Sequence, residues 1–161
     1  MLRPELLCAD GGVGATFVSR VRAASPDDLI AIRALLESAG LPTSDLTSAR
    51  SEFVAIHEEG TLVAAGALQR FGSSALLRSV VVSPTRRGIG LGASIVSELE
   101  RIAQEAKIAR LILLTQTADK FFAQRGYRVM ERTAAPSDVQ GSEEFRSLCP
   151  SSAVCMAKVL A

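Results

Sequence analysis

The stretch SPTRRGIGLG, Ser83 to Gly92, places two arginines and three glycines between a run of valines and a long amphipathic stretch. Valine favours a strand, and apolar residues after Gly92 recur every three or four positions, as in a helix packed on a sheet. Glycine costs conformational entropy in an ordered segment, so three of them within five residues indicate a close approach of backbone to a ligand. The stretch predicts a strand, a ligand-binding turn and a helix.

The composition is that of an ordinary globular chain. Its 161 residues fit one domain, and 48% hydrophobic with 22% charged residues argue against disorder. A net charge of +1 gives no general surface for nucleic acid. Because there is no apolar run of bilayer length and no signal peptide between Met1 and Ser25, we expect a cytoplasmic protein without membrane contact.

The cysteines do not indicate a metal site or a disulfide framework. Cys8, Cys149 and Cys155 form no CxxC motif, and His57 is the single histidine. Cys149 and Cys155 are expected to be buried, inert thiols, unless the last loop brings them to the active site.

The rest of the chain predicts one α/β domain over residues 16–161 after a poorly ordered leader, residues 1–15. Residues 110–115 form an apolar run typical of a buried strand, and we expect it to lie parallel to the strand before the long helix. Further strands are expected over residues 16–22, 52–57, 61–71, 75–82, 127–130 and 153–160, and helices from Pro26 to near Gly40, over 91–106 and over 118–124.

Two other phosphate-binding motifs fit the glycine turn less well. A P-loop requires Gly-Lys-Ser or Gly-Lys-Thr, and Gly92-Ala93-Ser94 lacks the lysine. Residues 88–93 match GxGxxG/A formally, but the next strand ends in Thr115-Gln116-Thr117, without the acid that holds a ribose. We expect a phosphate site with the charges of Arg86 and Arg87 at its mouth. The remaining alternative is a plain tight turn with both arginines in solvent.

The pattern Arg87-x-x-Gly90-x-Gly92, between a fourth strand and a long helix, resembles the GCN5-related N-acetyltransferase (GNAT) superfamily, over residues 16–160. The resemblance implies a mixed, mostly antiparallel sheet with helices on both faces and a splayed parallel strand pair. It also implies acetyl-CoA as co-substrate and no metal. The coenzyme would bind along the fourth strand and the turn, at Val80, Val81, Val82, Arg87, Gly88, Ile89, Gly90, Leu91, Gly92 and Ala93.

Three stretches, residues 75–82, 113–122 and 147–156, are similar to the arsenic-resistance N-acetyltransferases, relatives of the acetyltransferase part of acetylglutamate synthase. This kinship implies a small amino-acid-like amine as acceptor, such as a glutamate-like arsenical or phosphinic compound that acetylation would detoxify. A coenzyme A-binding sensor without turnover is the alternative function.

Arg78 is the first candidate to bind such an acceptor. By the period of two, it shares a strand face with Leu76, Val80 and Val82, and its guanidinium could hold a carboxylate. A structural ion pair with Glu52 or Glu59 is the equal alternative. Thr115 and Thr117 could also bind the acceptor, or cap the helix at Ala118.

The catalytic groups are less well defined. The resemblance makes the backbone N–H of Val81 the oxyanion donor. Many members place a tyrosine on the helix where this chain has Phe121-Phe122, so Glu52 and Tyr127 are weak candidates for proton transfer, with water as the alternative. Phe122 could flank the pantetheine or belong to the core, and Tyr127 is expected to point its hydroxyl outward. We expect His57 on the surface, and the last strand offers an edge for a homodimer.

Overall fold

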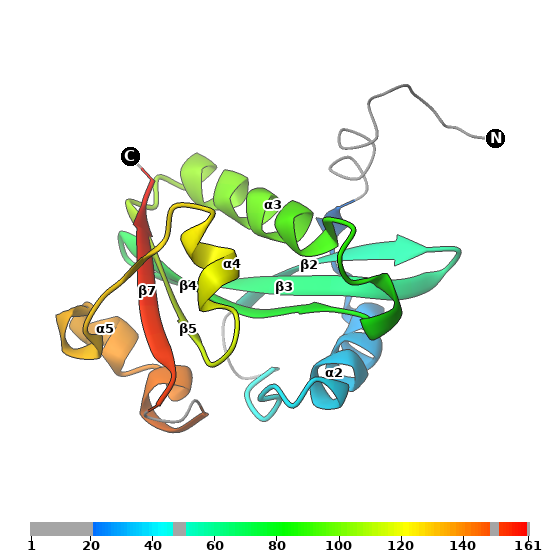
Figure 1. The fold of residues 1–161 in the computed structure, drawn as a ribbon, viewed down its shortest axis with the longest axis horizontal. Coiled ribbons are helices and arrows are strands. Elements are labelled where there is room, and N and C mark those ends of the chain that lie inside the picture. Colours follow the sequence, from blue (N-terminus) through cyan, green and yellow to red (C-terminus); the bar gives the residue numbers. More distant parts are fainter. Residues whose placement is uncertain (1–20, 47–50, 149–151, 161) are drawn as a thin grey trace. The chain divides into compact units, whose positions relative to one another are not determined.

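The computed structural model describes residues 21–46, 51–148 and 152–160 (Figure 1). The strands are β1 (Arg22–Ala23), β2 (Ser51–Glu58), β3 (Thr61–Phe71), β4 (Ser74–Val82), β5 (Arg110–Thr115), β6 (Arg128–Val129) and β7 (Val154–Val159). The α-helices are α2 (Leu29–Ser38), α3 (Leu91–Glu105), α4 (Asp119–Ala123) and α5 (Ser137–Gln140). Short 3-10 helices cover Pro26–Asp28, Pro84–Arg86 and Arg132–Ala134, and a π-helix covers Glu144–Leu148.

The strands form one seven-stranded sheet in the order β1-β2-β3-β4-β5-β7-β6. β4 and β5 run parallel, with Leu76 opposite Ile112, whereas β7 is antiparallel to both of its neighbours. The predicted parallel strand pair around the long helix is confirmed, as is the mixed, mostly antiparallel sheet. A parallel pair requires a crossover, and α3 supplies it.

Glycines end two elements where the sequence predicted breaks. Gly40 has φ +74° after α2, with its N–H donating to Glu37 and that of Leu41 donating to Leu36, which is a Schellman motif. Glu59 and Gly60, with φ 52° and 79°, turn the chain from β2 into β3, and positive φ at both residues is the signature of a type I′ hairpin.

By its contacts the described chain divides into two compact units. The first contains residues 21–41, Glu52–Ala67 and Ser79–Leu99. In Figure 1 the start of α3 and helix α2 cover opposite faces of β2 and β3. A Cβ at Gly66 of β3 would lie 2.5 Å from Ile95 Cγ2 and 3.1 Å from Leu99 Cδ1, so α3 packs directly on a glycine backbone.

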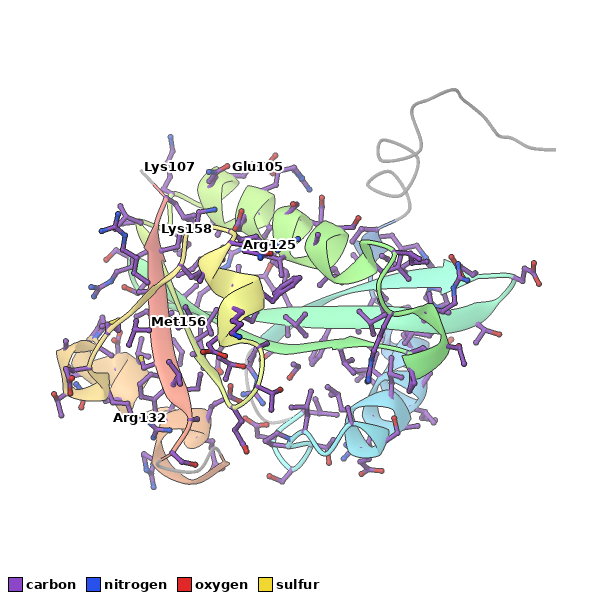
Figure 2. The ribbon with its side chains drawn as sticks, viewed as in Figure 1. Glu105, Lys107, Arg125, Arg132, Met156 and Lys158 are labelled. Atoms are coloured by element: carbon purple, nitrogen blue, oxygen red, sulfur yellow. The ribbon has the colours of Figure 1, made fainter. Side chains whose placement is uncertain are left out.

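The second unit contains the described residues of Pro42–Ser51, Leu68–Arg78 and Glu100–Ala161. Met156 on β7, labelled in Figure 2, is 1% exposed. A hydrophobic cluster joins β4, β5 and β7 to the segment between β6 and β7, and its buried members are Leu76, Ile112, Ala135, Val139, Phe145 and Cys155. The boundary between the units passes through β3, β4 and α3.

Some predictions fall at the edges of the described chain. The leader over residues 1–15 and most of the strand predicted over 16–22 lie outside the described residues, and β1 contributes Arg22–Ala23. Residues 136–148, for which no strand was expected, contain α5 and the π-helix Glu144–Leu148. Within the described residues, no helix is long and apolar enough to cross a membrane.

Candidate functional site

The glycine turn joins β4 to the amino end of α3. The 3-10 helix Pro84–Arg86 leaves the strand, and Gly88 and Gly90 then take φ of +84° and +94°. Residues that carry a Cβ rarely adopt this left-handed region of φ. A Cβ built on either glycine would meet no heavy atom within 4 Å. The turn is therefore an exposed backbone surface with open space in front of it.

Helix α3 places its first amide groups behind this turn. It begins at Leu91 and is 15 residues long, and Ser94 donates to the Gly90 carbonyl through both its N–H, at 3.1 Å, and its Oγ, at 3.2 Å. Backbone amides at the amino end of a helix attract anions because they lack carbonyl partners within the helix. The turn and the helix together suit a diphosphate.

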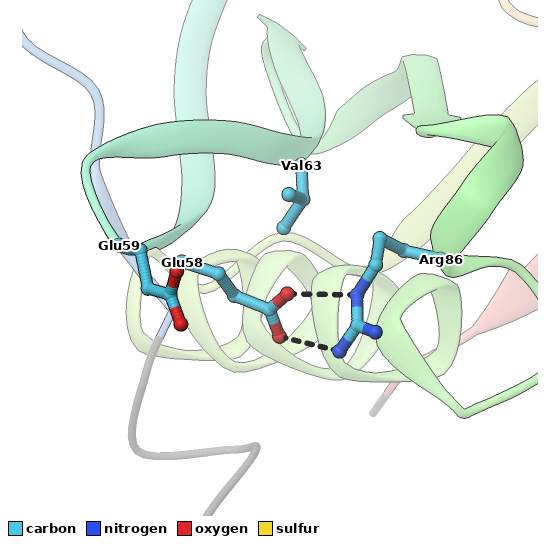
Figure 3. Close-up of a pocket in the computed structure, with 4 residues that line it drawn as sticks. All are labelled: Glu58, Glu59, Val63 and Arg86. Carbon is cyan, nitrogen blue, oxygen red and sulfur yellow. Dashed lines mark hydrogen bonds and ion pairs between the residues drawn. The ribbon is translucent and has the colours of Figure 1, made fainter.

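The two arginines of the turn take different positions. Arg87 is exposed, and its Nε donates to the carbonyl of Val82 at 3.1 Å. Arg86 instead turns to Glu58, with Nε 2.7 Å from Oε1 and Nη2 donating to Oε2 at 2.9 Å (Figure 3). A carboxylate at the end of β2 thus pairs with Arg86, so its charge is not free in solvent, whereas a phosphate contact by Arg86 or Arg87 stays a prediction.

Strand β4 does not keep a regular alternation up to the turn. Ser79 has φ 58°, so the backbone takes a left-handed residue inside the strand, in the manner of a β-bulge. Val80 beyond it lies beside the Cβ position of Gly66, with Ile95 and Leu99 of α3. The expectation of one face for Leu76, Arg78, Val80 and Val82 fails because the period of two does not survive such a residue.

Arg78 lies in a buried ion-pair cluster of the second unit. The residue is 3% exposed, and its Nη1 and Nη2 donate to Oδ2 and Oδ1 of Asp45, each at 2.6 Å. Nη1 also donates to Gln69 Oε1 at 3.3 Å, and Nη2 lies 3.4 Å from Glu144 Oε1. Arg78 is therefore part of a structural ion pair. Its partners here are Asp45 and Glu144, whereas Glu52 and Glu59 were the acids expected from the sequence.

Asp45 and Glu144 are themselves 2% and 5% exposed. Asp45 follows α2 and Glu144 begins the π-helix, so both lie far from Arg78 in the sequence. A charged residue next to turn-forming residues ordinarily indicates a solvated loop, which is why no local signal marked either acid. The role of Arg78 as an acceptor clamp stays a prediction.

Thr115 caps the turn after β5, and Thr117 does not. The Oγ1 of Thr115 accepts a hydrogen bond from the N–H of Ala118 at 2.9 Å. Thr117, the other candidate for this cap, is exposed. The hydroxyl three residues before the amide is the one that reaches it.

Tyr127 is buried and its hydroxyl is bound. It is 2% exposed and donates to Glu100 Oε2 at 2.8 Å, and Lys158, labelled in Figure 2, lies 3.2 Å from the same oxygen. Burial and the charge of Glu100 raise the pKa of this phenol. The expectation of an outward hydroxyl is wrong, because α3 offers an acceptor inside the fold.

Phe122 belongs to the aromatic cluster around Tyr127. It is 6% exposed, and its ring meets Tyr127 edge-on at 5.4 Å between centroids and Phe121 at 5.0 Å. Phe122 is therefore part of the core, as one of the two alternatives expected. A contact of Phe122 with pantetheine stays a prediction.

Glu52 and His57 are the remaining candidates from the sequence. Glu52 is exposed on β2. His57 lies with Nε2 3.0 Å from Asp28 Oδ1 and receives Arg22 Nη2 at Nδ1 at 3.1 Å. The backbone N–H of Ser25, followed by His57, lowers the pKa of Asp28.

Cys155 is a buried free thiol whose pKa is raised by burial, and Cys149 lies outside the described residues. The described ranges hold no group of three or more His, Cys, Asp or Glu able to bind a metal ion.

Comparison with known proteins agrees with this geometry. The family model of the acetyltransferase (GNAT) domain matches residues 49–129, which include the parallel strand pair, the glycine turn and α3. The chain belongs to the GNAT acetyltransferase family, and within it the chain is similar to amino-acid acetyltransferases.

An amino-acid acetyltransferase of Mycobacterium tuberculosis (strain ATCC 25618 / H37Rv) is 32% identical over 150 residues, which are 87% of this chain and 83% of that protein. The protein Rv2747 of Mycobacterium tuberculosis, solved in complex with CoA, is 27% identical with a TM-score of 0.75, over 88% of this chain and 99% of that one.

The acetylglutamate synthase of Neisseria gonorrhoeae, solved with coenzyme A and N-acetyl-glutamate, superposes with a TM-score of 0.76 at 23% identity. That match covers 88% of this chain and 35% of the synthase, so the chain spans about a third of the synthase.

Proposed function

We propose that this chain transfers the acetyl group of acetyl-CoA directly to the amine of a small amino-acid-like acceptor. The observation that carries the proposal is the glycine turn, where Gly88 and Gly90 hold positive φ with open space before the amino end of α3. A side chain at either position would stand in that space, so the turn fits a diphosphate that approaches the backbone.

The backbone of Val80, Val81 and Val82 lies next to the turn in sequence and, in the proposal, aligns the pantetheine and the acetyl group. Acetyl-CoA, when bound, supplies a thioester whose carbonyl carbon accepts the neutral amine of the acceptor. The N–H of Val81 is the proposed donor to the oxyanion that develops there. Because the Tyr127 hydroxyl is bound to Glu100, we assign the proton of the departing thiolate to water.

The acceptor proposal is an amino acid or a glutamate-like arsenical or phosphinic analogue, which acetylation would detoxify. Its support is the 32% identity to an amino-acid acetyltransferase and the three stretches of sequence similar to the arsenic-linked group. Arg78, Thr115 and Thr117 remain the proposed acceptor residues. For Arg78 the proposal has a condition: an acceptor carboxylate would have to replace Asp45 on the guanidinium.

The proposal includes a cytoplasmic location and a homodimer. The expected edge at the last strand is wrong, because β7 lies between β5 and β6, and the sheet ends at β6 instead. The exposed side chains of Val129 and Val159 lie on β6 and β7. An exposed sheet edge with apolar side chains favours pairing with a second copy. Light scattering of the purified chain tests the dimer.

Thiol release from acetyl-CoA, measured across amino acids, glutamate analogues, arsinothricin, phosphinothricin and aminoglycosides, tests the function. Turnover confined to amino acids and their analogues supports the proposal, and turnover confined to aminoglycosides contradicts the acceptor class. Tight acetyl-CoA binding without release favours the second candidate, a coenzyme A sensor, which the phenylalanine pair at Phe121 and Phe122 and the bound Tyr127 hydroxyl favour.

A further inference from the structure

The ion pair between Glu58 and Arg86 joins two turns of the first unit. Arg86 Nη2 donates to Glu58 Oε2 at 2.9 Å, and Arg86 Nε lies 2.7 Å from Oε1 without hydrogen-bond geometry, so two nitrogens face the two oxygens. The side chains of Glu58 and Arg86 are 16% and 39% exposed, respectively. The two residues line an open hollow with Glu59 and Val63 (Figure 3). A guanidinium whose two nitrogens face a carboxylate fixes the plane and the position of both groups.

Arg86 lies two residues before Gly88, the first glycine of the turn. It ends the 3-10 helix Pro84–Arg86, and its N–H donates to the Ser83 carbonyl at 2.9 Å. Ser83 in turn donates to the carbonyl of Val63 on β3 at 2.7 Å. The amino side of the turn is thus tied to the β2–β3 hairpin by one backbone contact and one ion pair.

The pair also decides which charge is available to a phosphate. The carboxylate of Glu58 neutralises Arg86 and turns its guanidinium toward the hairpin. Arg87, one residue later, is exposed, and its Nε donates to the carbonyl of Val82. The two arginines of the motif are therefore unlike in environment although they are adjacent.

We propose that Glu58 and Arg86 are positioning residues for the coenzyme diphosphate: their ion pair holds the residues before Gly88 in place, and Arg86 is not itself a phosphate ligand. This inference rests on the proposed function, in which the turn binds the diphosphate. It predicts that the two residues act as a unit on coenzyme affinity.

The test compares Glu58→Gln, Arg86→Gln and the exchanged pair Glu58→Arg with Arg86→Glu. Calorimetry with acetyl-CoA should show that each single change raises Kd about fivefold, and that the exchanged pair returns to within about twofold of the parent. The kcat at saturating acetyl-CoA should change little. Glu105→Gln, which breaks an exposed ion pair with Arg101 on α3, is the matched control and should leave Kd unchanged.

A direct phosphate contact by Arg86 predicts a different pattern. Arg86→Gln would then raise Kd, Glu58→Gln would leave or lower it, and the exchanged pair would be worst because it brings a carboxylate toward the diphosphate. That pattern, or unchanged Kd in both single variants, overturns the inference. If Glu58→Gln fails to fold, Arg86→Lys decides, since it keeps the charge and loses the paired nitrogens: a raised Kd supports positioning and an unchanged Kd contradicts it.

The positioning role and the proposed function can fail separately. If the parent chain binds acetyl-CoA and only the Glu58 and Arg86 variants behave otherwise than expected, the positioning role is wrong and the function stands. If the parent chain does not bind acetyl-CoA, the proposed function itself is wrong.

Discussion

Removing the charge of Arg78 should lower the free energy of unfolding more than any surface substitution does. In Arg78→Met the side chain keeps much of its volume, but Asp45, which is 2% exposed, loses a bidentate partner, and Glu144 loses a cation 3.4 Å away. Breaking a buried pair from one side costs about 3–5 kcal/mol, because the remaining charge stays in a poorly solvated site. For a chain of 161 residues this lowers Tm by about 6–20 °C.

Urea denaturation followed by circular dichroism measures this loss. Asp45→Asn in the Arg78→Met background should recover part of it, because the buried carboxylate is then gone. Arg101→Gln, on an exposed pair of α3, is the control and should change the free energy of unfolding by less than about 0.5 kcal/mol. A loss below about 1 kcal/mol for Arg78→Met would contradict this expectation, since it would mean that the cluster is effectively solvated.

The single variant Asp45→Asn separates the two roles predicted for Arg78. If Arg78 binds the carboxylate of the acceptor, Asp45 competes for the same nitrogens, and Asp45→Asn should lower the acceptor KM. If Arg78 only ties β4 to the segments that carry Asp45 and Glu144, Asp45→Asn should reduce stability and leave the acceptor KM unchanged in the folded enzyme.

Three further predictions concern single groups. Gly90→Val should weaken acetyl-CoA binding in calorimetry more than tenfold, because a branched side chain fills the space before α3, whereas Gly40→Val, with similar backbone strain at φ +74°, should not; equal affinities would remove the turn from the site. Tyr127→Phe should cost about 1 kcal/mol of stability in urea, through the bond to Glu100, with kcat within about twofold; a loss near 100-fold would instead identify Tyr127 as the proton donor. The pKa of Asp28 is lowered from its ordinary 3.8, so its contribution is complete above that value and disappears as the pH falls through the folded-state pKa; Asp28→Asn should flatten stability against pH in this acid range, and an unchanged curve would contradict the assignment.

Much of the fold could be predicted because its signals are local. The strand over residues 110–115 coincides with β5, and the apolar period after the glycine turn gives α3, which starts at Leu91. The turns at Gly40 and Gly60 fall where glycine supplies a positive φ. In each case the physical cause of the element, its apolar periodicity or a glycine with positive φ, lies within a few consecutive residues.

The candidate site could be predicted only in part. Glycine permits the positive φ at Gly88 and Gly90, whereas the open space before them depends on the surrounding fold. The left-handed Ser79 inside β4 has no such residue signal, and it ends the alternation on which the face of Val80 was predicted. The cap at Ala118 came from Thr115, because the hydroxyl that reaches an amide depends on the local path of the chain.

The order of strands and helices, the parallel crossover and the glycine turn follow from the sequence alone, since periodicity, turn residues and missing Cβ atoms act over a few neighbours. The partners of charged and polar side chains depend on the tertiary fold. Asp45 and Arg78 are 33 residues apart, Glu58 and Arg86 are 28 apart, and Glu100 and Tyr127 are 27 apart. A buried or half-buried charge takes the complementary group that packing brings within reach, and packing depends on the whole chain.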